Sequence, residues 1–264
     1  MTNIVMGVYN GYTGVKTKKG GIYYFLKSLR HYNKTCKIFI VCEKKHQFEE
    51  LKDICSEYNC VLYDDFVIAY EMMFFRFVIY EKIIKEQASI KKILLSDLND
   101  VIFQADPFEI EFKEELYCAT EQNLYGDEMN TSSVFNLSLL NDCRTKIKID
   151  TEILKNEYVI CAGSILGTLL GITQYLSFYI SSQPKMIPRF NDQALLNVYS
   201  YFFAPSKEIP HYTVSRILTL DQIPFNSLNI MDNTIYNEEN EPYAIIHQID
   251  RCNLPFMKFL VDSL

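Results

Sequence analysis

Apolar and polar positions alternate along the first half of the chain in two distinct patterns. Short apolar runs bounded by turn residues predict strands over 3–8, 37–42, 61–63 and 93–95. Longer stretches with apolar side chains at helical spacing predict helices over 22–32, 48–58 and 70–88. Strands and helices that alternate at this interval are typical of βαβ units, whose sheets are mainly parallel. The pattern therefore predicts an α/β, Rossmann-like fold with a mainly parallel central sheet flanked by helices.

The second half of the chain follows the same logic less regularly. Further strands are predicted over 116–120, 158–167, 214–218 and 243–246, and helices over about 168–182 and from Asn191 onward. The small residues at 162–164 predict a turn at which a ligand can approach the backbone closely. The polar stretch 122–133 is expected to be an exposed loop, and 134–157 has no clear pattern. Because no linker or internal repeat interrupts these elements, residues 1–264 are expected to form one domain.

Composition narrows the possible functions. The chain is 48% hydrophobic, enough for a sizeable core, and its net charge of −7 argues against a nucleic-acid groove, which needs positive charge. No apolar run is long enough for a membrane span, and the N-terminus lacks the basic and apolar regions of a signal peptide. The eight cysteines form no C-x-x-C pair. Reduced thiols and a cytoplasmic location are therefore expected.

The stretch from Ile93 to Phe108 carries the clearest candidate chemistry. An apolar strand ends at Ser96 and is followed by Asp97 and Asp100. Ligands of open α/β sheets bind just beyond the carboxyl ends of such strands. Paired carboxylates repel each other unless a cation joins them, and hard divalent ions that hold phosphates bind in this way. The stretch therefore indicates a metal site for a phosphorylated ligand; the alternative is a pair of carboxylates that cap a helix or face water.

Two other features bear on a phosphate site. The glycine-rich, lysine-containing segment 11–21 matches neither the dinucleotide-binding pattern nor the P-loop pattern. Arg76 lies in an apolar helical stretch, so its guanidinium must either pair with a partner or reach water. An ion pair with Asp64 or Asp65 and a contact with phosphate are both open alternatives.

In their order along the chain, these features resemble the nucleotide-sugar-dependent glycosyltransferases of the GT-A fold. The acidic stretch is similar to the motif S-D-x-R-D-V-x-F-Q-x-D-P-F of a branch found in algal, plant and large-virus sugar transferases. Residues 96–108 match it except at Asn99, where the branch usually has a basic residue. The resemblance spans about 3–251. It implies a nucleotide-binding part over about 1–120 and an acceptor-side part over about 121–264.

The resemblance also implies roles for individual residues. Asp97 and Asp100 would hold Mn²⁺ or Mg²⁺ on the diphosphate, Asp100 being the firmer ligand, with His247 as the third. Imidazole suits Mn²⁺ as oxygen donors do; the alternative for His247 is a solvent-facing residue at a strand end. The remaining donor-binding candidates would contact the base, ribose, sugar or phosphates: Tyr9, Asn10, Asp64, Asp65, Arg76, Asp97, Gly163 and Arg251.

Asp192 and Gln193 resemble the D-Q pair of retaining members, between donor sugar and acceptor. Asp192 would bind donor hydroxyls or stabilise an oxocarbenium-like centre; alternatives are a general base in an inverting reaction or an aspartate favoured at a helix N-terminus. The resemblance thus implies a metal-dependent hexosyl- or pentosyltransferase, related to viral enzymes. Its substrates would be a nucleotide sugar and a glycan acceptor, and retention of the anomeric configuration is favoured. A sugar-nucleotide pyrophosphorylase and a non-catalytic nucleotide-sugar-binding module are the alternatives.

Overall fold

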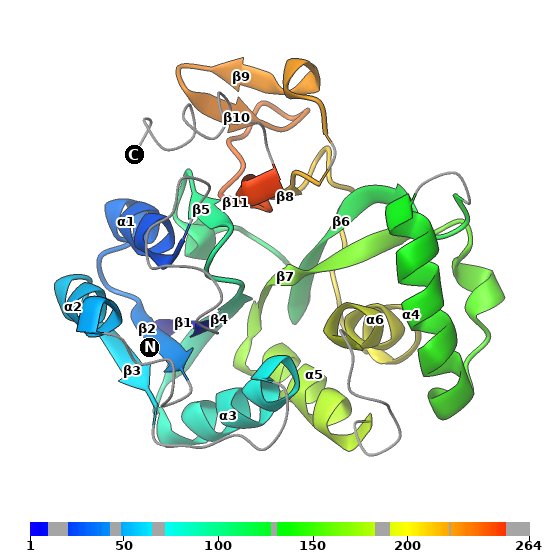
Figure 1. Cartoon of the computed structure of the whole chain (residues 1–264), viewed down its shortest axis with the longest axis horizontal. Coiled ribbons are helices and arrows are strands. Elements are labelled where there is room, and N and C mark those ends of the chain that lie inside the picture. Colours follow the sequence, from blue (N-terminus) through cyan, green and yellow to red (C-terminus); the bar gives the residue numbers. More distant parts are fainter. Residues whose placement is uncertain are drawn as a thin grey trace.

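The computed structural model describes residues 1–9, 21–42, 49–64, 72–127, 131–182, 191–221 and 223–251. Its largest sheet has six strands in the order β3-β2-β1-β4-β7-β6 (Figure 1). The parallel strands are β1 (Thr2–Tyr9), β2 (Lys37–Cys42), β3 (Cys60–Tyr63) and β4 (Ile90–Ser96). β7 (Tyr158–Thr168) pairs antiparallel with both β4 and β6 (Leu116–Leu124). The predicted α/β class with a mainly parallel central sheet is confirmed.

Side-chain alternation along β1 explains why helices cover both faces of this sheet. Ile4, Met6 and Val8 pack on one face, and Val5 and Tyr9 on the other, because successive strand side chains point in opposite directions. The first face is covered by α3 (Met72–Glu86), α5 (Leu169–Ser182) and α6 (Asn191–Val198). The second is covered by α1 (Ile22–Tyr32) and α2 (Glu49–Glu57), as Figure 1 shows. A strand buried on both faces requires the continuous apolar run seen in the sequence.

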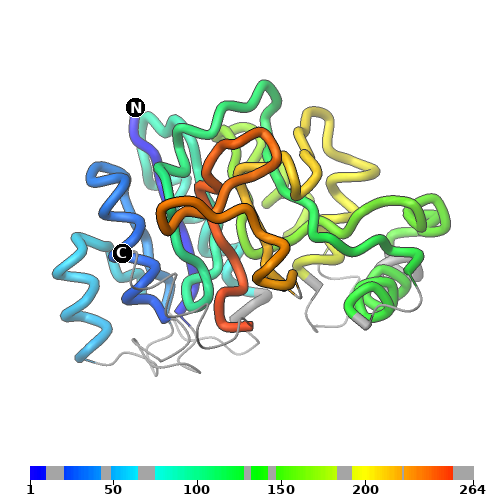
Figure 2. The backbone as a smooth tube through the Cα atoms, turned by 90° about the horizontal axis from the view of Figure 1, so that it is seen from above, coloured from blue at the N-terminus to red at the C-terminus, as the bar shows by residue number. Residues whose placement is uncertain are grey.

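A second sheet lies against the first and is built from distant parts of the chain. Its order is β5-β11-β8, formed by β5 (Val101–Phe103), β11 (Ile245–His247) and β8 (Ile217–Thr219). β11 is the central strand, antiparallel to β5 and parallel to β8. Figure 2 shows the red segment that contains β11 in the middle of the molecule. The acidic stretch 97–100 is therefore the connection between the two sheets. A hairpin of β9 (Asn229–Met231) and β10 (Thr234–Tyr236) completes the strands described.

Three predictions for the second half of the chain are wrong. The stretch 122–133 is not a continuous exposed loop, because β6 occupies its first residues up to Leu124 and α4 (Thr131–Ile147) occupies its last residues. The predicted turn at 162–164 lies inside β7, which runs without interruption to Thr168 and pairs Ser164 with Ser96 of β4. The predicted strand over 214–218 is displaced to 217–219. For β6 and β7, hydrogen bonding across the sheet overrides the local preference of polar or small residues.

Two further observations concern composition. None of the helices in the described ranges is both long and apolar enough to cross a bilayer. Six of the eight cysteines are described with their side chains, and these six are free thiols: Cys36, Cys42, Cys55, Cys60, Cys118 and Cys161.

Candidate metal and donor site

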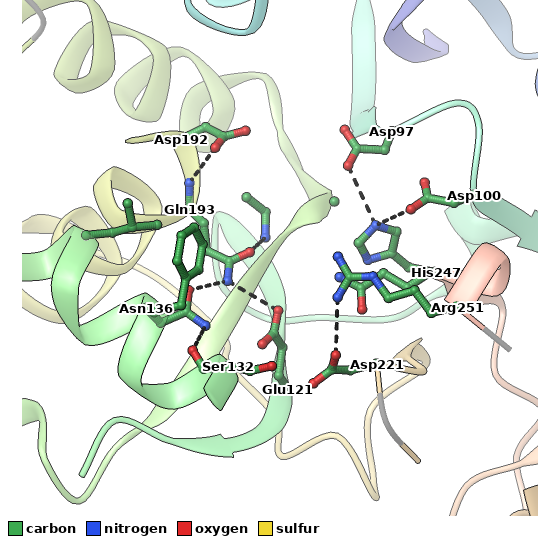
Figure 3. Close-up of a pocket in the computed structure, with 15 residues that line it drawn as sticks. Asp97, Asp100, Glu121, Ser132, Asn136, Asp192, Gln193, Asp221, His247 and Arg251 are labelled. Carbon is green, nitrogen blue, oxygen red and sulfur yellow. Dashed lines mark hydrogen bonds and ion pairs between the residues drawn. The ribbon is translucent and has the colours of Figure 1, made fainter. Parts of the chain in front are cut away.

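The connection between the two sheets holds Asp97 and Asp100 in place through backbone hydrogen bonds. The amide of Asp97 donates to the carbonyl of Gly163 at 2.9 Å, which fixes it against β7. The carbonyl of Asp100 accepts from the amide of Ile249 at 3.1 Å, just beyond β11. Both carboxylates point into the same cavity, and Figure 3 shows them beside the ring of His247. Two sheets thus converge to set the positions of these two acidic residues.

His247 completes a cluster with these carboxylates. Its Nε2 lies 3.6 Å from Oδ2 of Asp97 and 3.5 Å from Oδ2 of Asp100. One ligand atom from each of the three residues falls within 4.8 Å of the others. His247 is buried, with only 4% of its side chain exposed, because it ends the central strand of the second sheet. The sequence-based expectation that these three residues are close together matches the geometry, and a solvent-facing His247 is excluded.

The other edge of the His247 ring is enclosed by β7. A Cβ atom on Gly163 would lie 2.1 Å from Cε1 and 2.3 Å from Nε2 of His247, closer than any side chain permits. Cys161, two residues earlier in β7, places its Sγ 3.2 Å from Nδ1. Gly163 is therefore required by the ring of His247 itself, whatever ligand approaches the backbone.

Arg76, on α3, links the connection after β4 to the start of α6 next to this cluster. Its guanidinium, on α3, lies 3.0 Å from Oδ1 of Asp97 and also pairs with Oδ2 of Asp192 at the start of α6. Only 5% of the Arg76 side chain is exposed. The expected ion pair of Arg76 with a nearby carboxylate is present, but its partners are Asp97 and Asp192 rather than Asp64. Asp65 lies outside the described residues. The proposed contact of Arg76 with phosphate stays a prediction.

The cavity itself has a volume of about 360 Å³ and two walls. One wall carries the acidic pair, His247 and Arg251, and the other carries Asp192 and Gln193 (Figure 3). The Gln193 amide nitrogen donates to Asn136 at 2.8 Å and to Glu121 at 3.3 Å. These bonds, made by α4 and β6, hold the side chain of Gln193 in one orientation.

Arg251 closes the cavity on the side of the second sheet. Its guanidinium contacts Asp221 at 3.2 Å while about half of its side chain stays exposed. Asp221 also accepts from Asn123 of β6 at 2.9 Å. Arg251 therefore remains accessible for a negatively charged group that enters the cavity, as an exposed ion pair contributes little to stability.

Burial and charge shift the titration of these groups in different directions. The pKa of Asp100 is raised to about 6: burial is the largest cause, the charges of Asp97 and Asp250 act in the same direction, and those of His247 and Arg251 act against it. Burial would also raise the pKa of Asp97, but the hydrogen bond from His247 and the charge of Arg76 hold it below its usual value. Burial would lower the pKa of His247, yet its acidic neighbours and Cys161 raise it well above the ordinary value. Two carboxylates in unlike environments are a common feature of functional sites.

Glu121 is a buried acid that offers a test of this electrostatic description. Burial, with the charge of Asp221, raises its pKa, so this residue lowers stability progressively as the pH rises from its unfolded-state pKa through its raised folded-state pKa. We expect Glu121→Gln to be more stable than the wild type at pH 7.5, because the amide has no charge to bury. The difference should vanish below about pH 4, where both states of the wild-type chain are protonated. Urea unfolding at both pH values would measure it; equal stabilities at pH 7.5 would contradict the raised pKa.

The remaining predicted donor-binding residues divide into two groups. Tyr9 and Asp64 are at or just beyond the carboxyl ends of β1 and β3, and neither is among the described residues that line the cavity. Asn10 and Asp65 lie outside the described residues. Their role in holding the base and ribose stays a prediction.

Several residues in the cavity or next to it were missed in the sequence. Glu121 and Asp221 follow predicted apolar strands, so the rule that singled out Asp97 could have indicated them too. Asn136 lies in the stretch without a clear pattern, and nothing in the sequence singled out Cys161 or Gln248. Gln248 has a positive φ of 62° and a buried Oε1 without a hydrogen-bond partner, and such strain is found by structure alone.

Comparisons with known proteins bear on the fold. No protein-family model matches the chain, and no curated protein sequence matches it either. Among solved structures, an active-site mutant of LgtC has a TM-score of 0.52 at 12% identity, with 92% of this chain and 86% of that chain covered. At this identity the likeness establishes the fold alone, and it agrees with the GT-A-type α/β architecture expected from the sequence.

Two further solved structures have lower scores, and no inference is based on them. The glycosyltransferase GlyE of Streptococcus pneumoniae TIGR4 has a TM-score of 0.48 at 15% identity, over 94% of this chain and 54% of that chain. A glycosyltransferase involved in the glycosylation of the major capsid of PBCV-1 has a TM-score of 0.46 at 10% identity, with both chains covered completely.

Proposed function

We propose that this chain is a metal-dependent glycosyltransferase that moves a sugar from a nucleoside-diphosphate sugar to a hydroxyl group of a glycan, with retention favoured. The observation that carries the proposal is the convergence of Asp97, Asp100 and His247 in the cavity that also contains Asp192 and Gln193. The proposal includes the division into a nucleotide-binding part over about 1–120 and an acceptor-side part over about 121–264.

The three clustered residues fit a divalent cation by their chemistry. Two carboxylates and one imidazole are a donor set suited to Mn²⁺, and the carboxylates also suit Mg²⁺. The raised pKa of Asp100 indicates a buried acid whose neighbours do not fully compensate its charge, and a bound cation would supply the missing positive charge. Bound metal would offset the negative charge that develops on the departing diphosphate.

Strand order supports a donor site at this end of the sheet. β1 connects onward to β2 and β3 on one side, and β4 lies on its other side. Ligands of open α/β sheets bind at such a reversal of strand order, beyond the carboxyl ends of the strands. Tyr9 ends β1 and Asp97 follows β4, so a nucleotide at the reversal would have its diphosphate near the metal ligands. The exposed part of Arg251 would then be available to the phosphates.

Asp192 is the residue of this chain best placed to contact the transferred sugar. Arg76 pairs with Asp192 and Asp97 and so holds the Asp192 carboxylate in place at the cavity. A fixed negative charge there can accept hydrogen bonds from sugar hydroxyls and stabilise positive charge that develops at the anomeric carbon. Gln193 lies beside it with its amide held by Asn136 and Glu121, which favours a positioning role toward the acceptor.

Metal removal and donor binding test this function. Thermal unfolding would be followed with a panel of nucleotide sugars, with Mn²⁺ or with EDTA, for the wild type and Asp100→Asn. A donor at about 100 times its Kd stabilises the folded state by about 2.7 kcal/mol, a shift of several degrees in Tm for a chain of this size. We expect one donor to produce this shift only with Mn²⁺, and Asp100→Asn to abolish it.

The matched control is Glu152→Gln, which replaces an exposed acidic side chain outside the cavity. It should leave the donor-induced shift in Tm unchanged. Product analysis then separates the alternatives. A transferase releases nucleoside diphosphate when an acceptor is added, and a pyrophosphorylase releases pyrophosphate from a nucleoside triphosphate and a sugar phosphate. A binding module would shift Tm without turnover. The absence of a shift with any nucleotide sugar would overturn the proposal.

A further inference from the structure

The thiol of Cys161 occupies a position that the proposed reaction does not use. It lies on the far side of His247 from the two carboxylates, with Sγ 3.2 Å from Nδ1. Both residues are buried, Cys161 at 3% and His247 at 3% exposure. The imidazole is thus held between a thiol at one nitrogen and two carboxylates at the other.

Two positions of β7 fix this ring from the same side. Cys161 and Gly163 are two residues apart, so they face the same way on the strand. Gly163 leaves room for the ring atom Cε1, where a Cβ would lie 2.1 Å away, and Cys161 meets the adjacent Nδ1. The backbone of β7 is held in turn by the bond from the amide of Asp97 to the carbonyl of Gly163. The close backbone at Gly163 and the contact with Cys161 therefore both restrict rotation of the His247 ring.

The hydrogen-bond directions along this chain of groups are consistent with one another. An imidazole that binds a cation through Nε2 carries its proton on Nδ1, and this buried N–H needs an acceptor. The sulfur of Cys161 is an acceptor at the right distance. Ligand histidines generally donate their second N–H to a carboxylate, a backbone carbonyl or water, which fixes tautomer and orientation, and the thiol sulfur occupies that position here.

We propose that Cys161 is a positioning residue that holds His247 with Nδ1 protonated and Nε2 turned toward Asp97 and Asp100. This inference rests on the proposed function for the presence of a metal, and it adds a role for a residue outside the ligand set. It also gives a role to a buried thiol beside the cavity, because its sulfur can accept from the N–H at Nδ1.

The test measures Mn²⁺ affinity directly, by electron paramagnetic resonance of free Mn²⁺, in Cys161→Ala, Cys161→Ser and the wild type. We expect Cys161→Ala to bind Mn²⁺ about 10–100-fold more weakly, and Cys161→Ser to recover most of the loss because a hydroxyl also accepts and donates. Cys118→Ala is the matched control, since Cys118 is a buried cysteine of the neighbouring strand that packs in the apolar core; its affinity should equal that of the wild type.

A second measurement requires no variant and so remains decisive if Cys161→Ala folds poorly. Long-range ¹H–¹⁵N spectra of the wild-type protein loaded with Cd²⁺ should show His247 with its proton on Nδ1. A proton on Nε2, or equal Mn²⁺ affinity in Cys161→Ala and the wild type, would overturn the role of Cys161. Failure of the wild type to bind Mn²⁺ at all would instead contradict the metal dependence in the proposed function.

Discussion

Replacement of Arg76 by methionine is expected to lower the free energy of unfolding by about 3–5 kcal/mol, the usual cost of removing one partner from a buried ion pair. Methionine fills a similar volume but leaves Asp97 and Asp192 facing each other across the space of the guanidinium. Because only 5% of the Arg76 side chain is exposed, water cannot easily take the place of the guanidinium beside the two carboxylates. Urea unfolding at pH 7 would measure the loss.

The pH dependence of this loss has a definite sign. The folded-state pKa of Asp97 is depressed, so its ion pair stabilises the wild type above the unfolded-state pKa of about 3.9 and this contribution disappears as the pH falls through the folded-state pKa. The difference between Arg76→Met and the wild type should therefore shrink in acid. Loss of stability that is constant from pH 7 to pH 3 would indicate lost packing rather than lost charge.

Two comparison variants make the result specific. Arg216→Met removes an arginine that pairs with the half-exposed Glu241 at 3.6 Å, and it should cost only about 1 kcal/mol. The double variant Arg76→Met with Asp192→Asn should recover part of the stability, since it removes one uncompensated charge. Arg76→Met as stable as Arg216→Met would contradict a buried, doubly paired guanidinium.

Gly163→Ala is expected to have the second largest effect, in this case on metal affinity. The new methyl group would overlap Cε1, Nε2 and Nδ1 of His247, all within 2.6 Å, so the ring has to leave its place beside the carboxylates. We expect Mn²⁺ affinity to fall at least about 100-fold, at the upper end of the losses seen when a ligand is misoriented. Stability should fall by about 1–3 kcal/mol, as for other overpacked sites.

Gly171→Ala separates these two effects. A Cβ on Gly171 would lie 2.2 Å from the carbonyl oxygen of Glu115, a similar clash in α5, just after the end of β7 and away from His247. We expect it to destabilise the fold by a similar amount with unchanged Mn²⁺ affinity. If both variants lost metal equally, the requirement for glycine at 163 would reflect general stability. Calorimetric Mn²⁺ titration with thermal unfolding on each variant would decide.

Local patterns predicted the first half of the fold well because β1, β2 and β4 are mostly buried parallel strands, each with a continuous apolar run. The helix over Ile22–Tyr32 and the strand over Lys37–Cys42 have the predicted bounds. Beyond residue 120 the buried strands carry polar residues that are paired inside the protein. Asn123, for example, is buried in β6 and donates to Asp221, which is 98 positions away. A side chain satisfied by so distant a partner looks like a loop residue in the sequence.

The candidate site shows the same division. The strand-end rule and the family resemblance indicated Asp97, Asp100 and His247, and the structure brings these three together. The partners of Arg76 were not predictable from the sequence. Asp192 is 116 positions away from it, whereas Asp64 and Asp65 are much closer in the sequence. Cys161 and Gly163 acquire their importance only from a ring that belongs to another sheet.

The position of β11 has a consequence for the order in which a growing polypeptide can become active. β11 is the middle strand of the second sheet, yet it follows β5 and β8 in the chain, so those two strands have no common partner until residues 245–247 leave the ribosome. The larger sheet uses no residue beyond 168, so all of its strands are synthesised before β8 and β11. The nascent chain therefore contains Asp97 and Asp100 at a stage when His247 has not yet been made. Completion of the cation site would have to wait for β11, although its two acidic residues come much earlier in the chain.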